Sequence, residues 1–157
     1  MGSVVTVPII RLLHAVATTA MAGVIWTVQL VIYPLFAEVG EEVFTSYHTD
    51  YSERITWIVG PLMIVELGSA AALAIVAWKS GEGRLFALTG LLLVVALWLV
   101  TALVQVPQHG RLVAGFDEAT IAALVAGNWI RTVLWTLRVP MAWRMVSGGW
   151  QASKNRS

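Results

Sequence analysis

Four apolar runs dominate this chain, and each of them is long enough to cross a bilayer as a helix. A helix rises about 1.5 Å per residue, so about 20 apolar residues span about 30 Å of hydrocarbon. The runs do not alternate apolar and polar residues, and four strands cannot close a barrel, so only helices satisfy their backbone in lipid. The sequence therefore predicts an all-α fold, a four-helix transmembrane bundle. The predicted spans cover about residues 7–36, 55–78, 85–106 and 119–143.

Composition agrees with this class and excludes others. The chain is 58% hydrophobic and 12% charged, whereas about a quarter of the residues in a soluble domain are charged. We expect a single domain over residues 1–150, a disordered tail over 151–157 and a multi-pass location in the cell membrane, with the lipid bilayer as partner. The net charge of +1 and scattered basic residues predict no nucleic-acid binding. The absence of cysteine excludes disulfides and thiol chemistry.

Charge in the connections predicts the orientation. Lys and Arg favour the cytoplasmic side of a membrane. The connection after the first span is acidic, whereas basic residues follow the second and fourth spans, so both termini are expected inside. Within the acidic outer connection, residues 41–54 place Val43, Phe44, Tyr47 and Tyr51 at helical spacing. This pattern predicts an interfacial helix, which would act either as a lid or as an anchor.

Ionisable and amide side chains inside the predicted spans mark a candidate site. Such groups are costly in hydrocarbon and usually pair with one another. On the fourth span, Asn128, Arg131, Trp135 and Arg138 recur at i, i+3, i+7 and i+10, which places them on one stripe that should face the interior. Glu66 is the only carboxylate inside any predicted span, and counting residues places it near the depth of Arg131. The sequence therefore predicts that Glu66 and Arg131 interact.

These residues suggest roles in a reaction. His14, on the first span, would be the general acid or base, because its charge changes nearest neutral pH. Arg131 and Asn128 would stabilise negative charge on a substrate oxygen, and Glu66 would orient Arg131 or relay a proton. The competing interpretation is that polar groups simply hold the helices together. The candidate substrate-binding residues are aromatic or amide side chains at inward-facing positions: Trp26, Gln29, Trp98, Gln105 and Trp135.

Two histidines near the outer ends of the spans form a second candidate group. His48 and His109 could bind a metal ion or the two axial positions of a haem, although no further ligands stand at recognisable spacing. The sequence otherwise predicts no cofactor.

Two motifs in the second half of the chain resemble the anthrone-oxygenase-like family of small four-span membrane proteins, most of which have no assigned function. They are Val106-Pro107-Gln108-His109 followed by Leu112, and Asn128-Trp129-Ile130-Arg131-Thr132. Gly23 and Pro34 also fit the family pattern, whereas His109 stands where the family usually has Asn. The resemblance implies a four-span fold, and an oxidoreductase acting on polycyclic phenols without a metal.

The functional hypothesis is an intramembrane polar pocket that binds a lipophilic molecule, aromatic or quinone-like. The protein would be an oxidoreductase, an oxygenase-like enzyme independent of cofactors, or a binding protein. The alternatives left open are a proton-linked carrier or transporter subunit, a haem or metal protein and a structural accessory protein. The carrier, with Glu66 and His14 as its relay, would need a homo-oligomer, because four spans are few for a carrier acting alone.

Overall fold

The structure, a computed structural model, describes residues 2–147, and this part of the chain is helical without strands. Four long helical rods follow one another. The first comprises α1 (Gly2–Thr27), the π-helical segment η1 (Val28–Ile32), α2 (Tyr33–Leu35) and the 3-10 turn η2 (Phe36–Glu38). The second is α3 (Glu41–Ser80); the third joins α4 (Arg84–Val100), the π-helical η3 (Thr101–Gln105) and α5 (Val106–Val113); the fourth is α6 (Glu118–Val146). The predicted tail over 151–157 lies outside the described residues.

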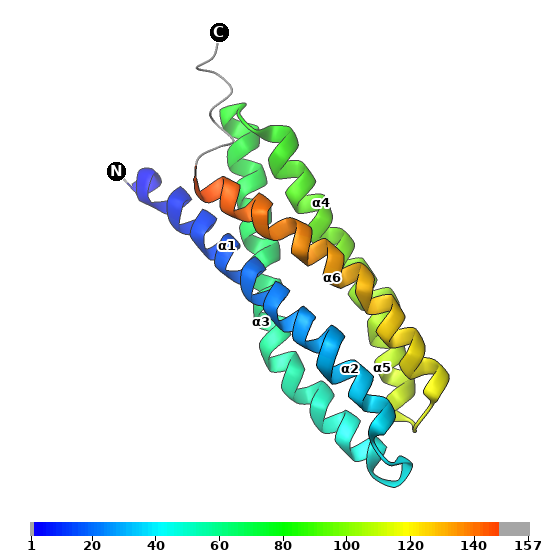
Figure 1. Cartoon of the computed structure of the whole chain (residues 1–157). Helices are drawn as coiled ribbons and strands as arrows, with labels where there is room; N and C mark the ends of the chain where they lie inside the picture. Colours follow the sequence, from blue (N-terminus) through cyan, green and yellow to red (C-terminus); the bar gives the residue numbers. More distant parts are fainter. Residues whose placement is uncertain (1, 148–157) are drawn as a thin grey trace.

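The rods form a four-helix bundle in which neighbours in sequence run in opposite directions (Figure 1). α1 contacts α3 and α6, and α4 also contacts α3 and α6, so the rods surround a common interior. In the described part of the chain, four helices are long and apolar enough to cross a membrane. The predicted all-α, four-span class is therefore confirmed by the length and composition of the rods.

The connection between the first and second rods differs from the prediction. Residues 41–54 are the first third of α3 rather than a separate interfacial helix, and only Val39 and Gly40 separate this helix from the preceding turn. The reason is local: residues 41–54 contain no glycine or proline, so nothing stops the helix from continuing into the apolar run. The third rod is also longer than predicted, because Pro107 stands in the first turn of α5, where proline is tolerated.

Both π-helical segments end just before a proline. Pro34 follows η1 and Pro107 follows η3. A proline cannot donate to the carbonyl four residues earlier and its ring collides with that carbonyl, so the preceding turn widens. The Tyr33 N–H accordingly reaches the carbonyl of Val28, five residues back. The extra residue in each turn changes the helical phase, and the rods thereby direct Tyr33 and Gln105 inward.

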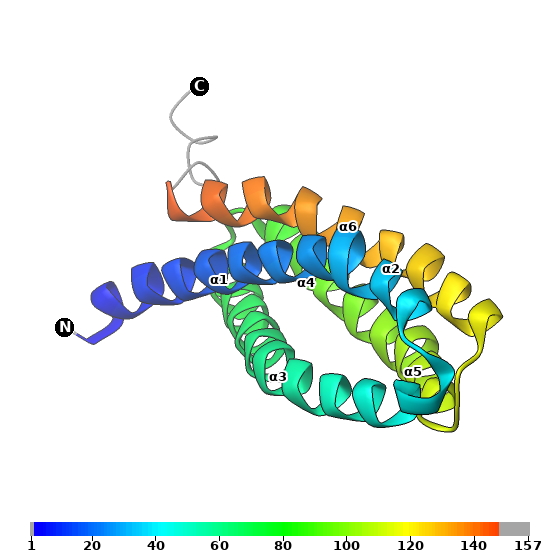
Figure 2. The same cartoon turned by 60° about the horizontal axis from the view of Figure 1, so that its bottom comes forward.

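α3 is curved, as Figure 2 shows, and it contains Pro61. A proline inside a helix removes one hydrogen bond and bends the axis. Residues on both sides of the bend, Val59 and Met63 among them, line a cavity inside the bundle.

The polar stripe predicted on the fourth rod is buried. Asn128, Arg131, Trp135 and Arg138 are all at most 5% exposed. This confirms the prediction that the four residues share one face of α6 and that this face turns inward.

Candidate functional site

A buried ion pair joins the second and fourth rods. The Arg138 Nη1 donates to Glu66 Oε1 at 2.7 Å, and both side chains are 2% exposed. The second carboxylate oxygen, Glu66 Oε2, accepts a hydrogen bond from the Trp135 indole at 2.8 Å. Both oxygens of Glu66 therefore have strong donors, which is the condition under which a buried carboxylate is tolerated.

The predicted pair between Glu66 and Arg131 is wrong. Trp135 lies between these two side chains: its Nε1–H bonds Glu66, while the Arg131 guanidinium stacks 5.3 Å from its ring centroid. α3 and α6 run in the same direction, and helical side chains lean toward the helix N-terminus, so the long Arg138 side chain reaches back to Glu66. Counting residues from span ends could not reveal this offset.

His14 belongs to the same cluster and is held by both ring nitrogens. Its Nδ1 lies 2.8 Å from Ser69 Oγ, and the Ser69 hydroxyl itself donates to the Val65 carbonyl at 2.6 Å. His14 Nδ1 must therefore carry the hydrogen, which leaves Nε2 to accept from Arg138 Nη2 at 3.4 Å. The structure places His14 in a satisfied network away from the cavity described below.

Asn128 and Gln29 form another link between rods. The Asn128 amide donates to Gln29 Oε1 at 2.9 Å, and the Gln29 amide donates to the Val125 carbonyl at 3.2 Å. Thr132 adds a longer bond to the same Gln29 oxygen. These contacts connect the first rod to α6 and agree with the interpretation of Gln29 as a group that holds helices together.

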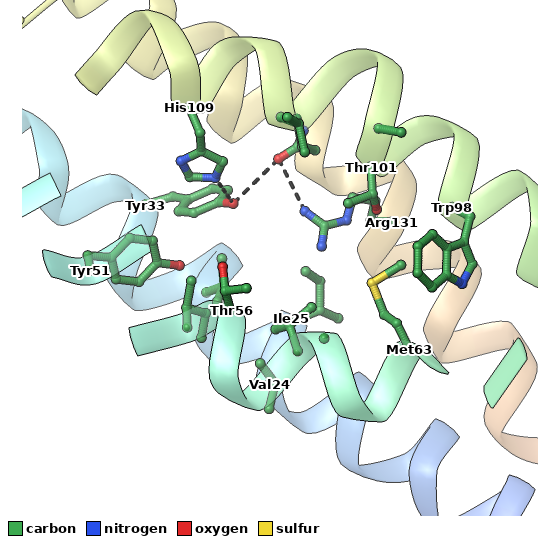
Figure 3. A pocket seen from close by; sticks show the side chains of 17 residues that line it. Val24, Ile25, Tyr33, Tyr51, Thr56, Met63, Trp98, Thr101, His109 and Arg131 are labelled. Atoms are coloured by element: carbon green, nitrogen blue, oxygen red, sulfur yellow. Dashed lines mark hydrogen bonds between the residues drawn. The ribbon is translucent and has the colours of Figure 1, made fainter. Parts of the chain in front are cut away.

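A cavity of about 280 Å³ lies between the first rod, α3 and the third rod (Figure 3). This volume is close to the lower end of the roughly 300–1,000 Å³ typical of small-molecule sites. Most of the wall is aliphatic. The polar or aromatic lining residues are Tyr33, Tyr51, Thr56, Trp98, Thr101, Gln105, His109 and Arg131.

Arg131 is the only described side chain in this wall that carries a permanent charge. It is 5% exposed, and its Nη1 donates to Gln105 Oε1 at 3.3 Å. Its buried Nε has no hydrogen-bond partner, and no carboxylate of residues 2–147 forms an ion pair with it. A buried cation without a counter-ion is costly, so an anionic or carbonyl oxygen in the cavity would be bound favourably.

A chain of hydrogen bonds leads away from this point. Tyr33 Oη lies 3.4 Å from Gln105 Oε1 and 2.9 Å from His109 Nε2 (Figure 3). His109 Nδ1 in turn lies 2.9 Å from His48 Nε2, and the two imidazole rings stack 5.1 Å apart. Tyr33, His109 and His48 come from three different rods, and only the folded bundle brings them together.

This contact does not fit the metal or haem alternative at His48 and His109. Two ligand bonds of about 2 Å on opposite sides of an iron would separate the nitrogens by about 4 Å, whereas these nitrogens bond each other directly at 2.9 Å. The described residues also contain no group of three His, Cys, Asp or Glu side chains able to hold a metal ion.

The cavity opens at its side. A groove between α3 and α5, lined by Ser52, Gly110 and Val113, shares Ile55, Thr56, Val106 and His109 with the cavity wall. The shared residues form the mouth, and Thr56 and Val106 are exposed there. A molecule moving along the outside of the bundle therefore meets the cavity without passing through the core.

The structure separates the sequence candidates into three groups. Arg131, Trp98 and Gln105 line the cavity, whereas His14, Glu66 and Trp135 form the ion-pair network, and Asn128 and Gln29 link rods. Trp26 lies on the outside, where it donates to Thr136 at 2.9 Å.

Sequence reasoning did not identify Tyr33 and Tyr51 as members of the site, and it did not identify Arg138 as the partner of Glu66. The position of Arg138 on the polar stripe was the available signal.

No family model, curated protein or solved structure matches this chain. A function for this chain is therefore inferred from the arrangement of its own residues.

We expect the Glu66–Arg138 pair to be structural. Glu66→Leu leaves a buried guanidinium uncompensated and should lower the free energy of unfolding by about 3–5 kcal/mol. The double variant Glu66→Leu/Arg138→Met removes both charges and should recover more than half of this loss. Unfolding in detergent, followed by tryptophan fluorescence, measures both. A double variant as unstable as the single one would contradict this assignment.

We expect Gly127 to keep Gln105 in place. A Cβ at Gly127 would lie 3.3 Å from Gln105 Nε2, so Gly127→Ala should displace this amide and weaken its bond to Arg131, at a cost of about 1 kcal/mol. Gly68→Ala is the matched control, because a Cβ there meets nothing within 4 Å. The same unfolding experiment should show Gly127→Ala less stable than Gly68→Ala, and equal stabilities would contradict the close approach.

Proposed function

We propose that this chain is a multi-pass protein of the cell membrane whose cavity binds a lipophilic, oxygen-bearing small molecule of the aromatic or quinone-like class. The observation that carries the proposal is Arg131, a buried cation without a described carboxylate partner, in the wall of an otherwise largely apolar cavity. An apolar pocket with a few convergent polar groups is the usual form of a small-molecule site.

The polar end of the cavity suits a single oxygen atom. Gln105 Oε1 already accepts from both Arg131 and Tyr33, at 3.3 and 3.4 Å. A ligand oxygen close to this position would meet the same two donors. Because Arg131 is charged, a phenolate, enolate or quinone carbonyl is favoured over a neutral hydrocarbon and strongly favoured over an amine.

The remainder of the cavity suits a flat apolar body. Trp98 and Tyr51 contribute aromatic faces, and Ile25, Val59 and Met63 contribute aliphatic walls. Aromatic rings pack well against such surfaces in offset or edge-to-face geometry. The side opening between α3 and α5 supports entry of a lipophilic molecule directly from the bilayer.

The charge-based orientation, with both termini inside, would place the cavity in the outer half of the membrane. Tyr33 and His109 stand near the ends of the first and third rods, away from the basic connection between α3 and α4. A ligand would then be exchanged with the outer leaflet.

The resemblance to the anthrone-oxygenase-like family favours an oxidoreductase over a simple binding protein. In its second motif, Arg131 lines the cavity while Asn128 and Thr132 bond Gln29, so one motif residue faces the ligand and two position the helix that carries it. His109, which departs from the family pattern, also lines the cavity, so a difference in ligand or chemistry is expected at this position.

The carrier alternative is less well supported by the geometry. A relay between Glu66 and His14 would pass through Arg138, which lies between them and contacts both. A guanidinium remains protonated in proteins and does not pass a proton on.

Binding of a coloured hydroxyanthraquinone to purified protein in lipid nanodiscs tests the proposal. Wild-type protein should bind it with partial quenching of the tryptophan fluorescence, to which Trp98 in the cavity wall contributes. Arg131→Met should weaken binding roughly 10- to 100-fold, because a hydrogen bond to a charged group is lost. Arg111→Met, at an exposed position outside the cavity lining, is the matched control and should bind like wild type. Equal affinity of the Arg131 and Arg111 variants would refute the proposed site.

A further inference from the structure

We propose that Tyr33, His109 and His48 form a proton relay that ionises the hydroxyl group of a ligand held at Arg131. This inference rests on the proposed function and adds to it: the ligand would be a weak oxygen acid that loses its proton inside the protein. The relay is distinct from the Glu66 and His14 cluster, which lies apart from the cavity and has its polar groups bonded to one another.

The geometry of the chain is continuous. Tyr33 Oη, at the polar end of the cavity, lies 2.9 Å from His109 Nε2, and His109 Nδ1 lies 2.9 Å from His48 Nε2. His109 offers one ring nitrogen to each neighbour, which is the arrangement that allows a proton to enter at one nitrogen and leave at the other, and His48 offers Nε2 to His109. Tyr33 is 2% exposed and His48 is fully buried, so bulk water does not interrupt the chain at these positions.

Two hydrogen-bond directions are available to the chain. In one, Tyr33 donates to His109, and His109 donates to His48, whose buried Nδ1 then carries a hydrogen. In the other, every donor is reversed and Tyr33 donates to Gln105 Oε1 at 3.4 Å. The 2.9 Å contact between Tyr33 and His109 is present in both directions: Tyr33 Oη donates in the first and accepts in the second. His48 Nδ1 has no partner in either direction, so nothing fixes the chain in one of them.

The transfer moves one proton and no electrons. The ligand O–H bond breaks and its proton passes to Tyr33 Oη, while the Tyr33 proton passes to His109 Nε2 and the His109 Nδ1 proton passes to His48 Nε2. Tyr33 and His109 end neutral. The products are a ligand oxyanion beside Arg131 and a His48 imidazolium, so the total charge is unchanged.

The surroundings of His48 can hold the resulting cation. Its ring stacks on Phe44 with centroids 5.6 Å apart and meets Phe36 in an edge-to-face arrangement with centroids 5.3 Å apart. Aromatic faces attract a cation, most strongly where water is excluded. The other aromatic neighbours of the His48 ring are His109 and Tyr51.

Charge couples the relay to the ligand. The titratable or charged groups that face it are Tyr51 of α3 and Arg131 of α6, and no Asp or Glu within residues 2–147 is bonded to its three members. Arg131 opposes a second positive charge at His48 as long as the cavity holds no anion. Formation of the ligand oxyanion removes this opposition, so the proton moves when a ligand is bound.

The experiment uses 4-nitro-1-naphthol, a bicyclic phenol whose anion absorbs in the visible, with the full-length protein in nanodiscs. At a pH below the ionisation midpoint of the free probe, wild-type protein should bind it as the anion. A pH indicator in weakly buffered medium should detect no proton release, because the proton stays on His48. Tyr33→Phe and His109→Gln should still bind the probe, but with an anion-to-neutral ratio lowered about tenfold or more.

Tyr47→Phe is the matched control, since it removes a tyrosine hydroxyl from α3 without touching the relay, and it should behave like wild type. Thermal unfolding of each variant shows that it is folded. The relay is overturned if the bound probe is equally ionised in wild type, Tyr33→Phe and His109→Gln, or if ionisation in wild type releases a proton to the medium. Absence of probe binding by wild type would overturn the proposed function together with the relay, whereas binding without ionisation would overturn the relay alone.

Discussion

The pairing of Glu66 with Arg138 is the interaction on which the rest of the interior depends. Among the buried residues that the structure describes, Glu66 is the only one with a carboxylate, and its two oxygens accept hydrogen bonds from Arg138 and Trp135. Arg131, two turns away on the same stripe, is thereby left without a counter-ion. Arg138 is held in the ion pair, whereas Arg131 remains available at the cavity wall.

Prolines interrupt three of the rods that surround the cavity next to Arg131. Pro34 and Pro107 widen the turns before them into π-helical segments, and Pro61 lies inside α3, which is curved (Figure 2). Rods interrupted in this way do not pack along their whole length, so space remains between them. The same changes of phase direct Tyr33 and Gln105 toward Arg131, which places hydrogen-bond donors and the space for a ligand at one level.

The interior thus contains two polar clusters, which differ in how many of their hydrogen-bonding atoms have partners. In the network of Glu66, Arg138 and His14, both carboxylate oxygens and both imidazole nitrogens have partners, as expected for a structural lock in an apolar environment. Arg131 Nε and Trp98 Nε1 in the cavity wall, and His48 Nδ1 next to His109, have none. Burying polar groups without hydrogen-bond partners costs free energy, and a bound ligand or a transferred proton would supply the missing interactions.

The sequence by itself determined the class of fold and the inward face of α6, because both follow from local rules: the length of an apolar run and the 3.6-residue period. It also indicated most of the polar residues that lie inside. Only the tertiary structure decided which of them meet. The choice of Arg138 over Arg131 depends on the offset between α3 and α6 and on the indole placed between them. The contact of Tyr33, His109 and His48 depends on three rods, two of which have an altered helical phase. These are properties of how helices pack, and no count along a single helix contains them.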